Sequence, residues 1–289
     1  MTAAASLPTS TSSPTSTMSR ALRTSLAEVF DRTRAEDRAA LIGYLPAGFP
    51  DRATSIRLMQ AMVAAGVDIV EVGLPYSDPL MDGPVIAAAA EAALADGTTT
   101  DDVLAVVDAV AETGAATLVM SYWNPIERYD LARFADGLAA AGGCGVITPD
   151  LTPEEASAWR LITDEQGLDR IFLVAPSSTP ERIATVVESC SGFVYAASVM
   201  GVTGARDSIA GDAESLVARV RATTDLPVCV GLGVSTGEQA GQIAGYADGV
   251  IVGSAFIKVI QAATSPEEAI EGVTALAREL ADGVRRRSR

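Results

Sequence analysis

The sequence predicts an α/β protein, a (β/α)8 barrel with an N-terminal helix and extra helices. Eight short apolar runs follow one another along the chain, and helical stretches separate them. Parallel strands joined by right-handed helical crossovers close into a barrel when there are eight of them. The chain has 289 residues and is 48% hydrophobic, which is enough for such a barrel. A doubly wound open sheet is the alternative, but the number of strands favours the barrel.

The N-terminal segment is expected to lie outside the barrel. Residues 1–18 are rich in Ser, Thr, Pro and Ala and have no apolar face, which predicts a disordered leader. This leader lacks the charged start and the apolar region of a secretory signal. Residues 19–289 are expected to form a single catalytic domain, whose first element is an amphipathic helix at 19–36.

Strands and helices then alternate along the rest of the chain. The predicted strands are at 41–45, 68–72, 116–120, 145–148, 170–174, 193–197, 227–231 and 249–252. The predicted helices between them are at 52–65, 84–95, 131–140, 153–165, 180–188, 213–222 and 236–244. Further helices are expected at 101–113, 254–263 and 266–283, and a solvated basic tail at 284–289. Two helices are expected to begin with Pro at their first position, at Thr152-Pro153 and Thr179-Pro180.

The composition excludes several classes of partner. The net charge of −16 argues against nucleic acid and anionic membranes, because both attract clustered Lys and Arg. No apolar run approaches the roughly 20 residues of a membrane span. The cysteines are odd in number, far apart and without a CxxC motif, which indicates buried thiols in a reducing, cytoplasmic location: Cys144, Cys190 and Cys229.

Two missing residue types restrict the chemistry further. The chain has no histidine, which excludes a Ser-His or Cys-His nucleophile, a His base and a His-ligated zinc or iron. Its single lysine, Lys258, lies inside a predicted helix rather than on a strand. No metal site is therefore predicted. Catalysis has to depend on carboxylates, tyrosines and backbone dipoles.

Residues 68–84 carry the most informative pattern, a buried strand followed by a loop punctuated by Gly and Pro. Glu71 lies in the middle of the strand, and Asp78 and Asp82 lie on the loop. Burying an unpaired carboxylate costs several kcal/mol. A structural Glu, paired with a neighbouring donor, is one interpretation. Two acids that face one cavity at the carboxyl end of a barrel strand are the other, because they are a common acid and base pair.

Three late βα junctions are rich in glycine and predict an anion site. They are 201–204 after the sixth predicted strand, 231–235 after the seventh, and Gly253-Ser254 at the start of the next helix. Glycine lets backbone N–H groups approach an anion, and a helix N-terminus adds partial positive charge. Barrels frequently hold a phosphate at the loops after strands seven and eight.

The sequence resembles the tryptophan synthase alpha chain family over roughly residues 20 to 265. The resemblance rests on the segment Glu71-Val-Gly-Leu-Pro-Tyr-Ser-Asp-Pro-Leu-Met-Asp-Gly-Pro84. The segments Tyr44-Leu-Pro-Ala-Gly-Phe-Pro50, Gly201-Val-Thr-Gly204 and Gly253-Ser254 agree with it. Met81 and Leu232 depart from the better-known members, as do Val199 and Met200, which affects the detailed shape of the pocket.

The resemblance implies cleavage of indole-3-glycerol phosphate to indole and glyceraldehyde 3-phosphate. Glu71 corresponds to the catalytic glutamate, and Asp82 to the aspartate that holds the indole N–H. The implied substrate-binding residues are Tyr44, Met120, Ile147, Leu173, Tyr195 and Thr203. The implied phosphate-binding residues are Gly204, Leu232, Gly233, Gly253 and Ser254. The resemblance also implies a beta subunit, which binds pyridoxal phosphate and receives indole in an αββα assembly, and no cofactor in this chain.

The residues are consistent with this reaction. Releasing an aldehyde by breaking a carbon–carbon bond needs an electron sink, and indole protonated at C3 supplies its own. The apolar strand around Glu71 is expected to raise the pKa of its carboxyl group toward the working pH. Two alternatives stay open: another phosphate-binding barrel, such as a sugar-phosphate isomerase or indole-glycerol-phosphate synthase, and a subunit that regulates a partner without chemistry.

Overall fold

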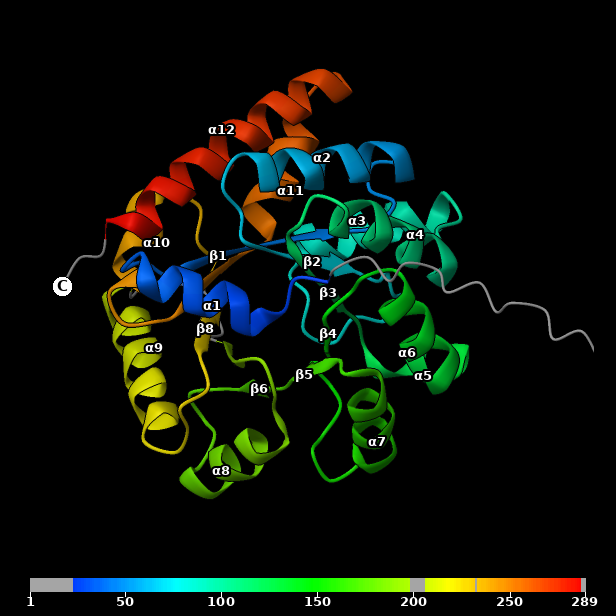
Figure 1. Cartoon of the computed structure of the whole chain (residues 1–289). Helices are drawn as coiled ribbons and strands as arrows, with labels where there is room; N and C mark the ends of the chain where they lie inside the picture. Colours follow the sequence, from blue (N-terminus) through cyan, green and yellow to red (C-terminus); the bar gives the residue numbers. More distant parts are fainter. Residues whose placement is uncertain (1–22, 198–205, 232, 287–289) are drawn as a thin grey trace, which may run out of the picture.

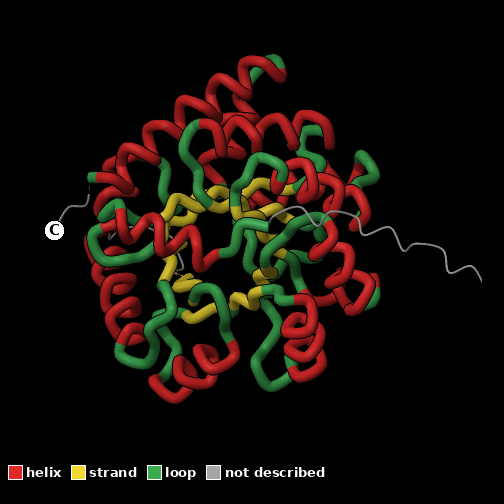
Figure 2. The backbone as a smooth tube through the Cα atoms, viewed as in Figure 1, coloured by secondary structure: helices red, strands yellow, loops and turns green. Residues whose placement is uncertain are grey.

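The computed structural model describes residues 23–197, 206–231 and 233–286. The predicted leader lies outside these residues, as do Thr203, Gly204 and Leu232 among the predicted site residues. Within them, the chain forms a ring of parallel strands surrounded by helices (Figure 2). The strands are β1 (Ala40–Pro46), β2 (Ile69–Gly73), β3 (Ala116–Met120), β4 (Gly145–Ile147), β5 (Asp169–Ile171), β6 (Leu173–Val174), β7 (Val194–Ala197), β8 (Val228–Gly231) and β9 (Gly249–Val252).

The described strands confirm the predicted barrel fold, with one strand divided in two. The sheet order is β5-β4-β3-β2-β1-β9-β8-β7-β6, so its two outermost strands are consecutive along the chain. Only Phe172 separates them, and together they occupy the position of the predicted fifth strand. β5 pairs with β4, whereas β6 pairs with β7. The chain itself therefore closes this TIM barrel between Ile171 and Leu173.

Helices form the outer ring of the barrel (Figure 1). They are α1 (Leu26–Ala35), α2 (Arg52–Ala64), α3 (Pro84–Ala95), α4 (Thr100–Ala111), α5 (Trp123–Tyr129), α6 (Leu131–Ala140), α7 (Ser157–Gln166), α8 (Pro180–Ser189), α9 (Arg206–Arg221), α10 (Gly237–Ala244), α11 (Ser254–Ala262) and α12 (Pro266–Arg285). α3 and α6 have the predicted bounds. None of the described helices is long and apolar enough to cross a membrane.

Some predicted helix boundaries were wrong. The structure begins α7 at Ser157, because residues 152–155 form a turn in which the Thr152 hydroxyl donates to the Glu155 carboxylate at 3.0 Å. The second predicted start is confirmed: the Thr179 hydroxyl accepts a hydrogen bond from the Arg182 N–H, and Pro180 opens α8. α1 begins at Leu26, where Ser25 and Glu28 form a capping box, and α9 begins at Arg206.

Two further differences concern the third βα junction and the C-terminus. The sequence analysis placed no helix at α5, which is only seven residues long and begins after Tyr122. The prediction of a solvated tail from residue 284 was wrong, since α12 continues to Arg285 and Val284 is fully buried. The amphipathic period of this helix continues past Gly283, which is itself buried against α10.

The barrel has an interior layer of side chains and an outer layer between strands and helices. The interior cluster includes Ile42, Ile69, Leu118 and Ile251 from four strands. Leu26, Val29 and Phe30 of α1 belong to the same cluster, so α1 covers the amino end of the barrel interior. The Phe30 ring lies edge-on to that of Phe193, with centroids 6.0 Å apart. The interior is therefore filled at one end, and the other end is left for a cavity.

Candidate active site

A cavity of about 390 Å³ lies at the carboxyl ends of the strands. It brings together nine of the residues that the sequence analysis selected: Tyr44, Glu71, Asp82, Met120, Leu173, Tyr195, Gly233, Gly253 and Ser254. Met81, Gly83, Ile86, Pro149, Ala197, Gly231 and Ile251 complete the lining. Residues that are up to 210 positions apart along the chain therefore share one site because the parallel strands all end at this rim.

Among the described residues that line this cavity, Glu71 is the only fully buried carboxylate. It lies in the middle of β2, and the register places it opposite Tyr44 of β1 and Leu118 of β3. Its side chain is 0% exposed, and both carboxylate oxygens lack a hydrogen-bond partner among the described residues. Burial without a partner disfavours the charged form and raises the pKa of Glu71 to about 8. The carboxyl group can therefore gain and lose a proton near neutral pH.

Two tyrosines flank Glu71 inside the barrel. Tyr44 comes from β1 and Tyr195 from β7, and burial raises the pKa of both phenols well above the usual value. Glycines on the neighbouring strands make room for these rings. A Cβ atom on Gly73 would lie 2.5 Å from the Tyr44 hydroxyl, and one on Gly231 would lie 2.4 Å from the Tyr195 hydroxyl. The tyrosines remain protonated over the physiological range and add hydroxyl groups, not charge, to the site.

Asp82 approaches the cavity from the loop that joins β2 to α3. Its pKa is raised by partial burial, and a hydrogen bond from the Tyr122 hydroxyl acts in the opposite direction. The same hydroxyl accepts a hydrogen bond from the Met81 N–H at 2.9 Å. The sequence analysis missed Tyr122. Its position directly after the third strand, at a βα junction, is the signal that could have identified it.

The anion end of the cavity is formed by glycines and a helix start. Gly233 has a φ of +65°, a backbone conformation that favours glycine, and it follows β8. Gly253 precedes α11, and Ser254 is the first residue of that helix. The N–H groups of a first helical turn have no partner within the helix, so they can bind a phosphate. Lys258, one turn further along α11, is exposed.

One described residue of the predicted site lies elsewhere. Ile147 of β4 is fully buried in the interior cluster and is not among the residues that line the cavity. Its register partners are Met120 of β3 and Ile171 of β5, and β4 ends at Ile147. Pro149 lines the cavity instead.

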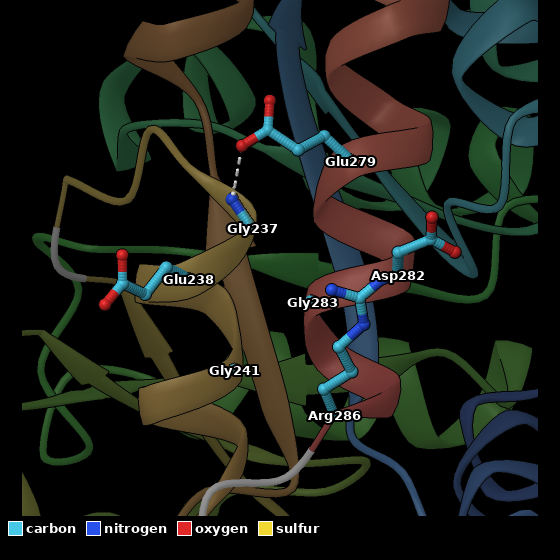
Figure 3. Close-up of a pocket in the computed structure, with 7 residues that line it drawn as sticks. All are labelled: Gly237, Glu238, Gly241, Glu279, Asp282, Gly283 and Arg286. Atoms are coloured by element: carbon cyan, nitrogen blue, oxygen red, sulfur yellow. Dashed lines mark hydrogen bonds between the residues drawn. The ribbon is translucent and has the colours of Figure 1, made fainter.

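A second cavity, of about 370 Å³, lies between α10 and α12 (Figure 3). The two helices are in close contact there, since a Cβ atom on Gly283 would lie 2.1 Å from the Gly237 carbonyl oxygen. Glu279 accepts a hydrogen bond from the Gly237 N–H at 2.8 Å, and Glu238 and Asp282 are exposed. These acids lie on the outer helices, away from the barrel interior.

Among residues 23–197, 206–231 and 233–286, no group of three His, Cys, Asp or Glu side chains is arranged to hold a metal ion.

Comparison with known proteins identifies the family of the chain. The profile of the family "Tryptophan synthase alpha chain" matches residues 30–285. The tryptophan synthase alpha chain of Thermobifida fusca is 60% identical over 271 residues, covering 93% of this chain and 99% of the relative. The alpha chain of Mycobacteroides abscessus is 59% identical over 261 residues, covering 90% and 97%.

Solved structures give the same result. A chain in the structure of tryptophan synthase from Mycobacterium tuberculosis superposes with a TM-score of 0.84 at 57% identity, covering 90% of this chain and 98% of that one. The crystal structure of the tryptophan synthase alpha subunit from Legionella pneumophila has a TM-score of 0.82 at 32% identity, covering 90% and 97%. Sequence, barrel and cavity all lead to one conclusion: the chain belongs to the tryptophan synthase alpha chain family.

Proposed function

We propose that Glu71 and Asp82 are the two catalytic acids with which this protein performs the reaction of its family. That reaction is the lyase cleavage of indole-3-glycerol phosphate to indole and glyceraldehyde 3-phosphate. Members of the family pass indole to a beta subunit, which holds pyridoxal phosphate, for tryptophan synthesis; the alpha chain carries no such cofactor. We further propose that residues 19–289 act as one catalytic domain, in the cytoplasm.

This proposal rests on the burial of the Glu71 carboxylate and on its lack of a hydrogen-bond donor among the described residues. A structural glutamate would have a donor, whereas both oxygens of Glu71 are buried without one among the described residues, and the side chain lies at a cavity. A pKa of about 8 makes the group a competent proton donor and acceptor near neutrality. The interpretation of Glu71 as a paired structural residue is therefore not supported.

The chemistry that we assign to these groups needs no further electron sink. A proton delivered to C3 of the indole ring converts it to the indolenine. The glycerol hydroxyl next to the scissile bond then loses its proton, its oxygen forms the aldehyde carbonyl, and the electron pair of the breaking carbon–carbon bond restores the aromatic ring. We assign both proton transfers to Glu71. Asp82 accepts a hydrogen bond from the ring N–H and stabilises the positive charge that develops there.

The remaining site residues are assigned to binding. Tyr44, Met120, Leu173 and Tyr195 line the cavity and are proposed to hold the indole and the glycerol chain. Gly233, Gly253 and Ser254 are proposed to bind the phosphate through backbone N–H groups and the start of α11. Thr203, Gly204 and Leu232, which lie outside the described residues, are proposed for these roles on the basis of the family resemblance alone.

The test is release of indole from indole-3-glycerol phosphate by the purified chain. Glu71→Gln is expected to lower kcat by at least about 100-fold, because general acid–base groups contribute factors of that order. Asp82→Asn is expected to give a similar loss. Melting temperatures and circular dichroism establish that both variants are folded. Turnover like that of the wild type in Glu71→Gln would remove Glu71 from the mechanism, and no indole from the wild type would refute the function.

Addition of the beta chain provides a second measurement. In tunnel-linked enzymes the partner closes the loops over the site, so the rate of indole production should rise when the complex forms. The exposed loop residues Ser77 and Asp78, at the carboxyl end of β2, are proposed to face the partner. An unchanged rate in a complex that forms stably would contradict this coupling.

A further inference from the structure

We propose that Tyr122 is the positioning residue for Asp82, fixing the catalytic loop between β2 and α3 to the body of the barrel. This inference rests on the role proposed above for Asp82. Tyr122 contacts the loop rather than the reacting atoms: its hydroxyl accepts from the Met81 N–H at 2.9 Å, and it lies beside the Asp82 carboxylate, whose pKa it lowers. One hydroxyl group thus holds two consecutive residues of the loop.

Tyr122 is itself rigidly placed. Tyr122 is 5% exposed, and its carbonyl oxygen accepts a hydrogen bond from the Ser121 hydroxyl at 2.7 Å. The next residue, Trp123, donates its N–H to the Asp150 carboxylate at 2.9 Å at the start of α5. The Trp123 ring in turn lies edge-on to that of buried Trp159, with centroids 5.6 Å apart. The hydroxyl is therefore presented from a fixed strand-to-helix junction.

The loop that it holds is exposed and has few other anchors. Leu80 is 81% exposed and Met81 is 52% exposed, so neither side chain fixes the loop by packing. The junction after β3 also contacts the first part of the loop. The Tyr76 and Tyr122 rings lie 5.4 Å apart between centroids, and the Asn124 amide donates to the Tyr76 hydroxyl at 3.0 Å. Two segments of one loop are thus attached to a single junction.

The contact also affects the protonation of Asp82. The titratable groups around Asp82 are Glu71 of β2, Tyr44 of β1, Tyr195 of β7 and Tyr122. Partial burial raises the pKa of Asp82, and the hydrogen bond from Tyr122 lowers it. A hydrogen bond that is donated to a carboxylate stabilises the charged form, which is the form that can accept the indole N–H. Removing the hydroxyl should therefore misplace Asp82 and raise its pKa.

Tyr122→Phe tests this inference, since it removes the hydroxyl and keeps the ring against Tyr76. The expected result is a fall in kcat/KM of about 10-fold, comparable to the loss of one charge-assisted hydrogen bond. The acidic limb of the kcat/KM profile should move to higher pH. Tyr129→Phe is the matched control. Tyr129 is the last residue of α5, the helix that follows Tyr122, and donates to the carboxylate of Asp101 outside the cavity. This control should keep the wild-type rate and profile.

A double-mutant cycle separates positioning from a general structural effect. In the Asp82→Ala background, Tyr122→Phe should cost less than about 2-fold, because its partner is absent. The inference would be overturned by any of three results. These are a full 10-fold loss of kcat/KM in the Asp82→Ala background, an equal loss in Tyr129→Phe, and a pH profile of Tyr122→Phe that does not shift. Full activity of Tyr122→Phe alongside an inactive Asp82→Ala would also refute it while leaving the proposed function intact. Full activity of Asp82→Ala would instead refute the proposed role of Asp82.

Discussion

Two buried acids three residues apart have opposite surroundings: Asp68 directly precedes strand β2, and Glu71 lies in the middle of that strand. Asp68 is 7% exposed and receives two hydrogen bonds from Arg38, at 2.6 and 2.8 Å, and one from the Leu41 N–H at 3.0 Å. Glu71 is 0% exposed and has no partner for either oxygen among the described residues. The first acid stabilises the amino end of the barrel. Glu71, by contrast, has no hydrogen-bond partner among the described residues and faces the cavity at the carboxyl ends of the strands.

The difference separates two roles in one segment: the paired Asp68 stabilises the fold, and the unpaired Glu71 is left able to titrate. A bidentate pair between Arg and a carboxylate satisfies both partners, and the hydrogen bond with Asp68 raises the pKa of Arg38 above its usual value. Glu71 instead retains a cost of burial, and that cost is what brings its pKa to about 8. Stability is thus reduced at the position to which we assign proton transfer.

The largest change in stability is expected from Asp68→Asn. It leaves the buried guanidinium of Arg38 without its main partner, and breaking such a pair costs about 3–5 kcal/mol in the free energy of unfolding. Chemical denaturation measures this loss, while indole release per folded molecule should stay at the wild-type value. Asp31→Asn is the control, since Asp31 is 76% exposed in its pair with Arg34 and should change stability by less than about 0.5 kcal/mol. Equal stability of the two variants would contradict the comparison.

A smaller and pH-dependent change is expected from Glu71→Gln. The folded-state pKa of about 8 exceeds the ordinary value of 4.5, so the stabilisation from proton binding is complete below about pH 4.5 and is lost as the pH rises to about 8. Gln cannot ionise. The melting temperature of Glu71→Gln, relative to the wild type, should therefore rise by about 5–10 °C between pH 5.5 and pH 8.5.

Differential scanning fluorimetry over this range measures the effect, and Glu36→Gln is the control. The Glu36 side chain is 47% exposed and pairs with Arg38 at 2.6 Å. The melting temperature of Glu36→Gln, relative to the wild type, should be nearly constant from pH 5.5 to pH 8.5. A constant difference for Glu71→Gln as well would show that Glu71 does not titrate in this range, and the contrast with Asp68 would fail.

The smallest change is expected from Arg32→Ala, which removes the second arginine at Asp68. The Arg32 side chain is 48% exposed and donates one hydrogen bond at 3.2 Å. Half-exposed pairs contribute about 0–1 kcal/mol, so the loss should stay within that range in denaturation experiments. A loss as large as that of Asp68→Asn would mean that the whole network, rather than the pair with Arg38, stabilises this end.

Much of the site could be predicted because it depends on local sequence. Glu71 is surrounded by apolar residues on its own strand, and the Gly253-Ser254 pair opens a helix, so both could be placed without knowing the fold in detail. The barrel then follows from the alternation of strands and helices. The division of the predicted fifth strand at Phe172 could not be predicted, because it depends on which neighbour each half pairs with.

Tertiary contacts account for the other differences. The hydrogen bonds of Tyr122 join two βα loops, and no spacing in the sequence indicates them. The Thr152-Pro153 pattern is typical of a helix start, but Glu154 pairs with Arg182 of α8 at 2.5 Å while the preceding residues remain in a turn. Ile147 was expected to line the pocket, yet it is buried in the interior cluster, and Pro149, two residues later, lines the cavity instead.

The position of α1 restricts the route by which the substrate enters and the products leave the barrel. Because Leu26, Val29 and Phe30 are packed into the amino end of the barrel, ligands cannot pass along the barrel axis. The phosphate ester must arrive, and both products must depart, through the same rim of loops. A protein bound on that rim would therefore control both substrate entry and product release. It could bind a small aromatic product before that product diffuses into solvent.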